Sequence, residues 1–110
     1  MNTGKTATVR VEPVNGIACH LHTSALPELW GRVENFAKEV LVWIFTNTHY
    51  LKAITFIPEY NRPAIQLAKR CGMKEEGCIT QSFLKDWKLR DQFIYGFTKK
   101  EFFKFINKEG

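Results

Sequence analysis

The chain has 110 residues, a length that suits one domain built around a single hydrophobic core. Its residues are 45% hydrophobic and 25% charged, without a low-complexity run, and this composition excludes a disordered chain. The net charge of +5 favours anionic partners, but the basic residues are scattered along the chain. A solvated basic surface is the simpler interpretation, and we expect no nucleic-acid partner.

The cysteines and the N-terminus indicate the compartment. Cys19, Cys71 and Cys78 form no CxxC or CxxH pair, which argues against a disulfide framework and against a structural zinc site. We expect free thiols, with Cys71 and Cys78 buried rather than nucleophilic. Signal-peptide layout and membrane-length apolar runs are both missing. The sequence therefore predicts a cytoplasmic protein with no membrane partner.

The chain begins with a predicted hairpin. Residues 7–12 alternate apolar and polar side chains, the period of a half-buried strand. Residues 13–16 (Pro-Val-Asn-Gly) supply turn chemistry, and residues 17–23 have the composition of a second strand.

A loop and a helix follow. Residues 24–31 contain a proline and are predicted to be a loop. Apolar residues over 32–46 recur with helical spacing. Because Val42 and Trp43 widen this apolar stripe, we expect the helix to be buried on more than one side.

The central segment predicts a strand that runs directly into a second helix. Residues 51–57 are almost continuously apolar, as expected of an inner strand. Asn61 is placed to cap the helix, Pro63 stands where a missing N–H costs little, and Gly72 supplies the stop. A helix N-terminus offers N–H groups to anions and carbonyls, so this junction is a candidate ligand site.

The remaining sequence predicts a hairpin and a final helix. Residues 73–84 and 89–97 are predicted strands joined by a turn around residues 86–87, and residues 99–108 a short basic helix. The class is α+β with a mixed sheet in the order ββαβαββ(α). Its central β-α-β unit should bring two parallel strands together.

The segment after the inner strand carries a family resemblance. Its spaced residues are Asn61, Lys69, Gly72-Met73 and Glu76-Gly77. They resemble the Asn…Lys-x-x-Gly-Phe-x-x-Glu-Gly pattern of the ribosomal-protein branch of the GNAT superfamily of acetyl-CoA-dependent N-acetyltransferases. The chain is also similar to small phage-encoded GNAT-like proteins.

The resemblance implies a minimal GNAT-like fold and acetyl transfer to a primary amine on a small molecule or a protein. Acetyl-CoA, as co-substrate, would bind where the two parallel strands splay apart. Residues 1–110 would form one domain without the family's usual N-terminal strand and helices. That acceptor wall would be absent or supplied by a partner subunit, so a homodimer is one expected assembly.

The cofactor site implied by the resemblance consists of Asn61 and the start of the first helix, Trp30, Gly31 and Arg32. Asn61 would hydrogen-bond the cofactor or acetyl carbonyl, act as a plain N-cap, or do both. The pyrophosphate would sit on the helix N-terminus. The loop departs from the family's Arg/Gln-x-x-Gly-x-Gly/Ala motif, because Trp30 stands at the basic position in one alignment.

His20 and His22 are the candidate catalytic residues. Period-two geometry places both imidazoles on the same face of their strand. In the superfamily this strand often carries the group that accepts the proton of the attacking amine, and an imidazole suits that role. For His22 this role and a structural role are evenly balanced, whereas for His20 a structural role is favoured. His-x-His alone positions no third ligand, so no metal site is expected.

The general acid is missing from its expected positions. The tyrosine that many members use to protonate the thiolate falls at Ala68, and the serine of the ribosomal branch falls at Ala64. Tyr60 is a substitute, although a packed aromatic is the favoured interpretation. An alternative function therefore stands beside the enzyme: a catalytically degenerate GNAT-like module with a structural or assembly role, such as a phage-encoded protein.

Overall fold

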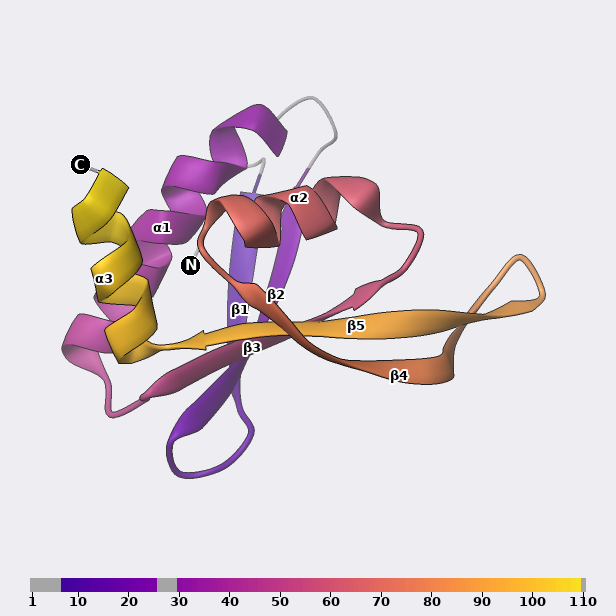
Figure 1. Ribbon diagram of the computed structural model, residues 1–110, viewed down its shortest axis with the longest axis horizontal. Coiled ribbons are helices and arrows are strands. Elements are labelled where there is room, and N and C mark those ends of the chain that lie inside the picture. Colours follow the sequence, from indigo (N-terminus) through magenta and orange to yellow (C-terminus); the bar gives the residue numbers. More distant parts are fainter. Residues whose placement is uncertain (1–6, 26–29, 110) are drawn as a thin grey trace.

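The computed structural model describes residues 7–25 and 30–109 (Figure 1). The elements follow the predicted order ββαβαββα: β1 (Ala7–Pro13), β2 (Ala18–Ala25), α1 (Trp30–Asn47), β3 (Lys52–Pro58), α2 (Arg62–Arg70), β4 (Lys74–Lys85), β5 (Lys88–Thr98) and α3 (Lys99–Glu109). The predicted α+β class is confirmed.

One mixed sheet contains all five described strands, in the order β1-β2-β3-β5-β4. Strands β2 and β3 are parallel, as the central β-α-β unit predicted, and the other neighbours are antiparallel. The three helices gather on one side of strands β3, β5 and β4, and the tip of the β4–β5 hairpin projects beyond them (Figure 1). The core therefore lies between the sheet and these helices.

Aromatic side chains fill the core where α1, β5 and α3 meet. Phe45, Phe97 and Phe102 are at most 1% exposed. The ring centroid of Phe102 lies 5.7 Å from that of Phe45 and 5.2 Å from that of Phe97. Burial of this size dominates the stability of a small domain, because each large apolar side chain contributes about 1.5–3 kcal/mol.

The expectation that α1 is buried on more than one side is wrong. Val42 is 37% exposed and Trp43 is 50% exposed, whereas Val40, Leu41 and Ile44 are almost fully buried. The sheet and the other helices pack against one side of α1, so the opposite side of the helix meets solvent.

The loop between β2 and α1 is shorter than predicted. Ser24 and Ala25 pair with β1 and extend the strand, and Trp30 and Gly31 already have helical backbone. Residues 26–29 lie outside the described part of the chain.

The three cysteines form no disulfide with one another, and the burial of Cys78 differs from the prediction. Cys19 and Cys71 are buried, whereas Cys78 is exposed. Cys78 lies in β4, an edge strand whose residues are mostly exposed, so its position in a strand did not bury it. Among the described residues, no helix is both long and apolar enough to cross a membrane.

Candidate functional site

The parallel strands β2 and β3 separate part-way along their length. Their ladder contains three residue pairs, Ala18–Lys52, Cys19–Ala53 and His20–Ile54, although β2 continues to Ala25 and β3 to Pro58. Just past the last pair, the Thr55 hydroxyl donates a hydrogen bond of 3.1 Å to the Leu21 carbonyl. Beyond this bond the two strands no longer pair with each other, and their facing edges border an opening.

A cavity of about 180 Å³ lies at this opening. Both strands contribute three or more consecutive residues to its wall, among them Leu21, His22 and Thr23 of β2. Helices α1 and α2 contribute mainly small and apolar side chains, namely Ala37, Leu41, Ala64, Leu67 and Ala68. The cavity is thus mostly apolar with a few polar groups, the usual character of a small-molecule site.

Asn61 lies at the cavity wall and caps α2. Its side-chain Oδ1 accepts a hydrogen bond of 3.3 Å from the Ala64 N–H, which confirms the predicted N-cap. The side-chain amide Nδ2 is a separate donor, so capping leaves Asn61 able to donate to another group.

The backbone of α2 offers less to a ligand than the sequence suggested. The N–H of Arg62 bonds to the Tyr60 carbonyl, and the N–H of Ile65 bonds to the Asn61 carbonyl. Pro63 has no N–H, and the Ala64 N–H is taken by the cap. These first N–H donors are bonded within the protein, so the N-terminus of α2 is not a ready anion-binding site. The group that this junction offers to a ligand is the Asn61 side chain.

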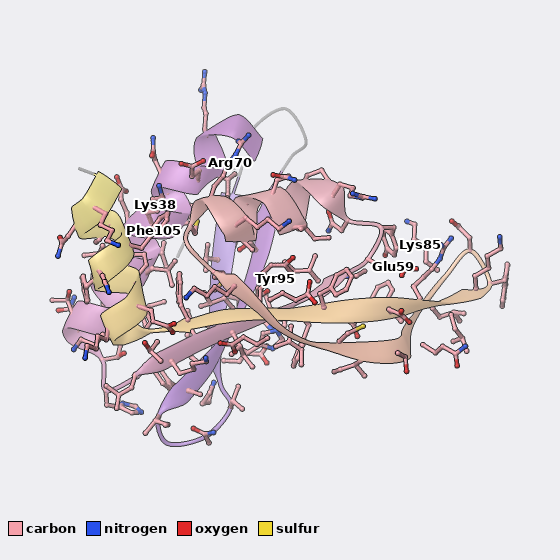
Figure 2. The ribbon with its side chains drawn as sticks, viewed as in Figure 1. Lys38, Glu59, Arg70, Lys85, Tyr95 and Phe105 are labelled. Carbon is pink, nitrogen blue, oxygen red and sulfur yellow. The ribbon has the colours of Figure 1, made fainter. Side chains whose placement is uncertain are left out.

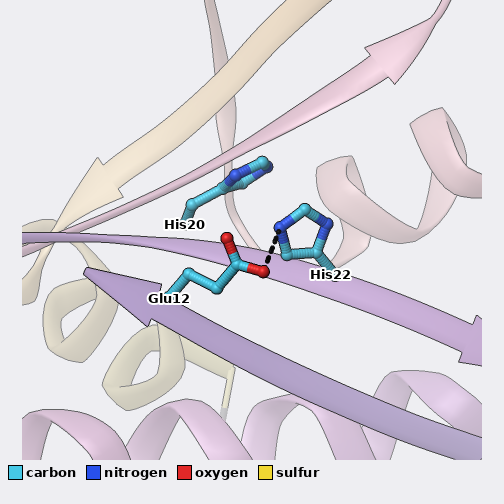
Figure 3. Close-up of side chains that lie close together, drawn as sticks. All are labelled: Glu12, His20 and His22. Atoms are coloured by element: carbon cyan, nitrogen blue, oxygen red, sulfur yellow. Dashed lines mark ion pairs between the residues drawn. The ribbon is translucent and has the colours of Figure 1, made fainter. Parts of the chain in front are cut away.

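His20 and His22 lie together on one face of β2, as predicted, with ring centroids 3.9 Å apart (Figure 3). The rings of Phe56 and His20 meet in a T-shaped contact at a centroid distance of 4.7 Å. Desolvation by burial, and secondarily the neighbouring His22, lower the pKa of His20. Of the two histidines, His22 lines the cavity and His20 does not.

Glu12 joins the two histidines, although no sequence motif pointed to it. The antiparallel register pairs Glu12 with His20, and the Glu12 carboxylate lies 3.6 Å from Nε2 of His22 (Figure 3). Arg10 holds the same carboxylate oxygen through an ion pair of 2.9 Å. Residues 7–12 were correctly predicted as a strand that alternates polar and apolar positions, and pairing them with residues 17–23 would have placed Glu12 next to the histidines.

The predicted pyrophosphate-binding residues are only partly described. Trp30 and Gly31 begin α1, but the Trp30 side chain lies outside the described part of the chain. Arg32 follows them and is exposed.

None of the described tyrosines replaces the missing acid in the cavity wall. Tyr60 packs near Phe83 and carries the Lys85 ammonium 4.7 Å above its ring, on the side of the hairpin. Tyr95 is 3% exposed and points from β5 towards α2 (Figure 2). Burial raises the pKa of Tyr95, yet neither phenol lines the cavity, whereas Ala64 and Ala68 do.

The fold is that of the GNAT acetyltransferases. A structure of mutant forms of the spermidine/spermine N-acetyltransferase SpeG of Vibrio cholerae superposes with a TM-score of 0.80 at 18% sequence identity, over 90% of this chain and 62% of that chain. The same enzyme in complex with CoA and spermine gives a TM-score of 0.80 at 19% identity, over 89% and 60% of the two chains. A GNAT-family acetyltransferase of Bacillus anthracis gives 0.77 at 14% identity, over 86% and 59%.

Sequence comparisons add nothing to this likeness. No protein-family model and no curated protein matches the chain in sequence. The chain spans about three fifths of the length of these structural neighbours. At such low identity the likeness defines the fold, and the activity has to be argued from the site.

Proposed function

We propose that the chain is an acetyl-CoA-dependent N-acetyltransferase domain that transfers an acetyl group to a primary amine. The observation that carries the proposal is the splayed pair β2 and β3, whose opening leads into a cavity covered by α1 and α2. A parallel ladder that stops after three pairs leaves backbone N–H and C=O groups along the opening. These groups suit an amide-bearing chain such as pantetheine, because it can pair with them as a strand would.

The proposed donor pose uses the polar groups around the cavity. Pantetheine lies along the unpaired edge of β2, against the apolar side chains of α1 and α2. The Asn61 Nδ2 donates to a carbonyl of the cofactor or of its acetyl group. The pyrophosphate sits at the start of α1, near Trp30, Gly31 and Arg32, where the helix dipole and the arginine favour negative charge.

In the proposed reaction, His22 accepts the amine proton. The amine nitrogen attacks the thioester carbonyl, the C–N bond forms and the C–S bond breaks. His22 lines the cavity and its Nε2 makes no hydrogen bond among the described residues, so in this proposal it takes the proton directly or through a water molecule. Since Ala64 and Ala68 cannot donate a proton, solvent protonates the departing thiolate. We also propose two finer points. The chain belongs to the ribosomal-protein branch, and a homodimer supplies the acceptor wall.

Acetyl-CoA binding is the first test. At a ligand concentration 100 times the Kd, binding should stabilise the fold by about 2.7 kcal/mol, which a thermal-shift assay detects. Ala64→Leu fills the cavity and should abolish the shift, whereas Gln66→Leu adds the same side chain on the exposed side of α2 and should keep it. No shift of the wild-type protein at millimolar acetyl-CoA would refute the proposal.

The rate of CoA release tests whether His22 is the catalytic base. Spermidine is the first acceptor to try, because the Vibrio cholerae neighbours are spermidine N-acetyltransferases. The release of CoA is monitored with a thiol-reactive dye in the presence of EDTA. His22→Ala should slow CoA release without weakening acetyl-CoA binding. Equal rates for the two proteins, measured with any accepted amine, would remove His22 as the base.

A second candidate function is a catalytically degenerate GNAT-like module with a structural or assembly role. It is favoured by Ala64 and Ala68 in the cavity wall, where the family's acids are expected. This module would show no acetyl-CoA-dependent stabilisation, or would bind acetyl-CoA without releasing CoA to any amine of a broad panel. The two assays above therefore separate the candidates.

A further inference from the structure

We propose that Glu12, His20 and His22 form a binding site for a divalent transition-metal ion, with Zn²⁺ as the best-matched ion. The three side chains come from the paired strands β1 and β2 and stand on one face of the sheet (Figure 3). Each offers one ligand atom, and the three atoms lie within 4.8 Å of one another. Two imidazole nitrogens and one carboxylate oxygen are a donor set that catalytic zinc sites use.

The geometry lies close to that of a bound ion. Zinc holds nitrogen and oxygen ligands at about 2.0–2.2 Å, so two ligand atoms of a tetrahedral site are about 3.4 Å apart. The Glu12 oxygen and the His22 Nε2 are already 3.6 Å apart. The other distances between ligand atoms exceed the tetrahedral value by at most about 1.5 Å. Small rotations of the side-chain torsions can close this difference.

The His22 Nε2 provides an independent observation. This nitrogen is buried and makes no hydrogen bond within the described part of the chain. Buried polar atoms are normally satisfied, so an unsatisfied ring nitrogen that faces a carboxylate and a second imidazole points to a missing partner. A metal ion at the centre of the three side chains would supply that partner.

The surroundings support the ligands and keep one side open. Arg10 binds the Glu12 carboxylate at 2.9 Å and can orient it, as outer partners of ligating carboxylates do, although its positive charge also weakens attraction for a cation. The Phe56 ring restrains His20. Glu12 is about half exposed, so water has access to complete the coordination shell.

Occupancy of this site would control the proposed reaction. A metal ion on His22 uses the lone pair that would otherwise accept the amine proton, so Zn²⁺ should inhibit acetyl transfer and EDTA should restore it. This consequence rests on the proposed function. Metal binding itself does not, and it is measured without acetyl-CoA.

The test is a calorimetric titration of the metal-free, untagged chain with ZnCl₂, together with the absorption spectrum of Co²⁺ as a spectroscopic substitute. We expect one ion per chain and intense Co²⁺ bands typical of tetrahedral coordination. Glu12→Gln and His20→Gln should each weaken Zn²⁺ binding more than about tenfold, because even outer-shell changes cost that much. Circular dichroism verifies that each variant is folded.

The matched control is His49→Gln. His49 is the remaining histidine of the chain, is exposed and stacks on Tyr50, away from the cluster. This variant should bind Zn²⁺ as tightly as the wild type. If the wild-type chain binds no stoichiometric Zn²⁺ up to roughly 100 μM, the proposal is overturned. It is also overturned if the cluster variants bind like the wild type, or if His49→Gln weakens binding as much as they do.

Discussion

Asn61 allows capping and ligand binding to be separated by substitution. Asn61→Ala removes both the Oδ1 acceptor and the Nδ2 donor. The cap bond to the Ala64 N–H is 3.3 Å long and only partly buried, so its loss belongs in the lower part of the range for N-caps, about 0.5–1 kcal/mol. For a domain of this size that corresponds to a fall in Tm of about 2–8 °C.

Two further variants keep the cap and remove the donor. Asn61→Asp and Asn61→Ser retain a side-chain oxygen for the Ala64 N–H, and aspartate adds a favourable charge at the helix N-terminus. Their Tm should equal or exceed that of the wild type. If Nδ2 donates to the cofactor, the serine variant loses about 0.5–1.5 kcal/mol of binding, or about 2- to 12-fold in Kd, and the aspartate variant loses more.

The assays are thermal denaturation without ligand and calorimetric titration with acetyl-CoA. The expected pattern is a low Tm for Asn61→Ala alone and weak binding for all three variants. Binding that is unchanged in the serine and aspartate variants would show that Asn61 is only a cap. An unchanged Tm in Asn61→Ala would refute the capping argument.

Two further predictions concern the start of β4 and the start of α3. Gly72 has φ +95°, and a Cβ built there would meet the Phe105 ring at 2.7 Å. Gly72→Ala should therefore lower the free energy of unfolding, measured by urea denaturation, by at least about 1 kcal/mol. Gly16 has open space around it, so Gly16→Ala should change this free energy little. The Glu101 carboxylate accepts a hydrogen bond of 2.8 Å from the Thr98 N–H, which lowers the pKa of Glu101. Its contribution to stability is therefore present above the unfolded carboxyl pKa of about 4.3 and is lost as the pH falls through the lower folded value. A pH series of urea denaturations should show this loss in the wild type and a smaller one in Glu101→Gln; identical slopes would contradict the assignment.

The elements were predictable because their signals are local. The alternation of residues 7–12, the Asn61 cap and the stop at Gly72 each depend on a few neighbouring residues, and the structure confirms all three. The exposure of Trp43 and Cys78 was not predictable in the same way. Whether an apolar or sulfur-bearing side chain is covered depends on which other elements pack above it, and a single stretch of sequence does not contain that information.

The Glu12 cluster depends on register rather than on composition. Asn15 closes the hairpin by accepting hydrogen bonds from the N–H groups of Ile17 and Ala18, each of 2.9 Å. That turn fixes Glu12 opposite His20. A slip of one residue would turn the Glu12 side chain to the other face of the sheet, so the cluster could be found only after the two strands had been paired.

In the proposed function, the splay of β2 and β3 would let one site receive two substrates. In a continuous sheet, successive side chains point to opposite faces and cannot share a cavity. Here Leu21, His22 and Thr23, three successive residues, all line the same cavity. The cavity therefore borders the gap between the strands. A donor held under α1 and α2 would present its acetyl group at this gap, and an amine arriving from the opposite face would meet both the thioester and His22. In the proposed reaction the gap is thus the reaction centre, and a Zn²⁺ ion beside Glu12 would occupy the amine's side of it.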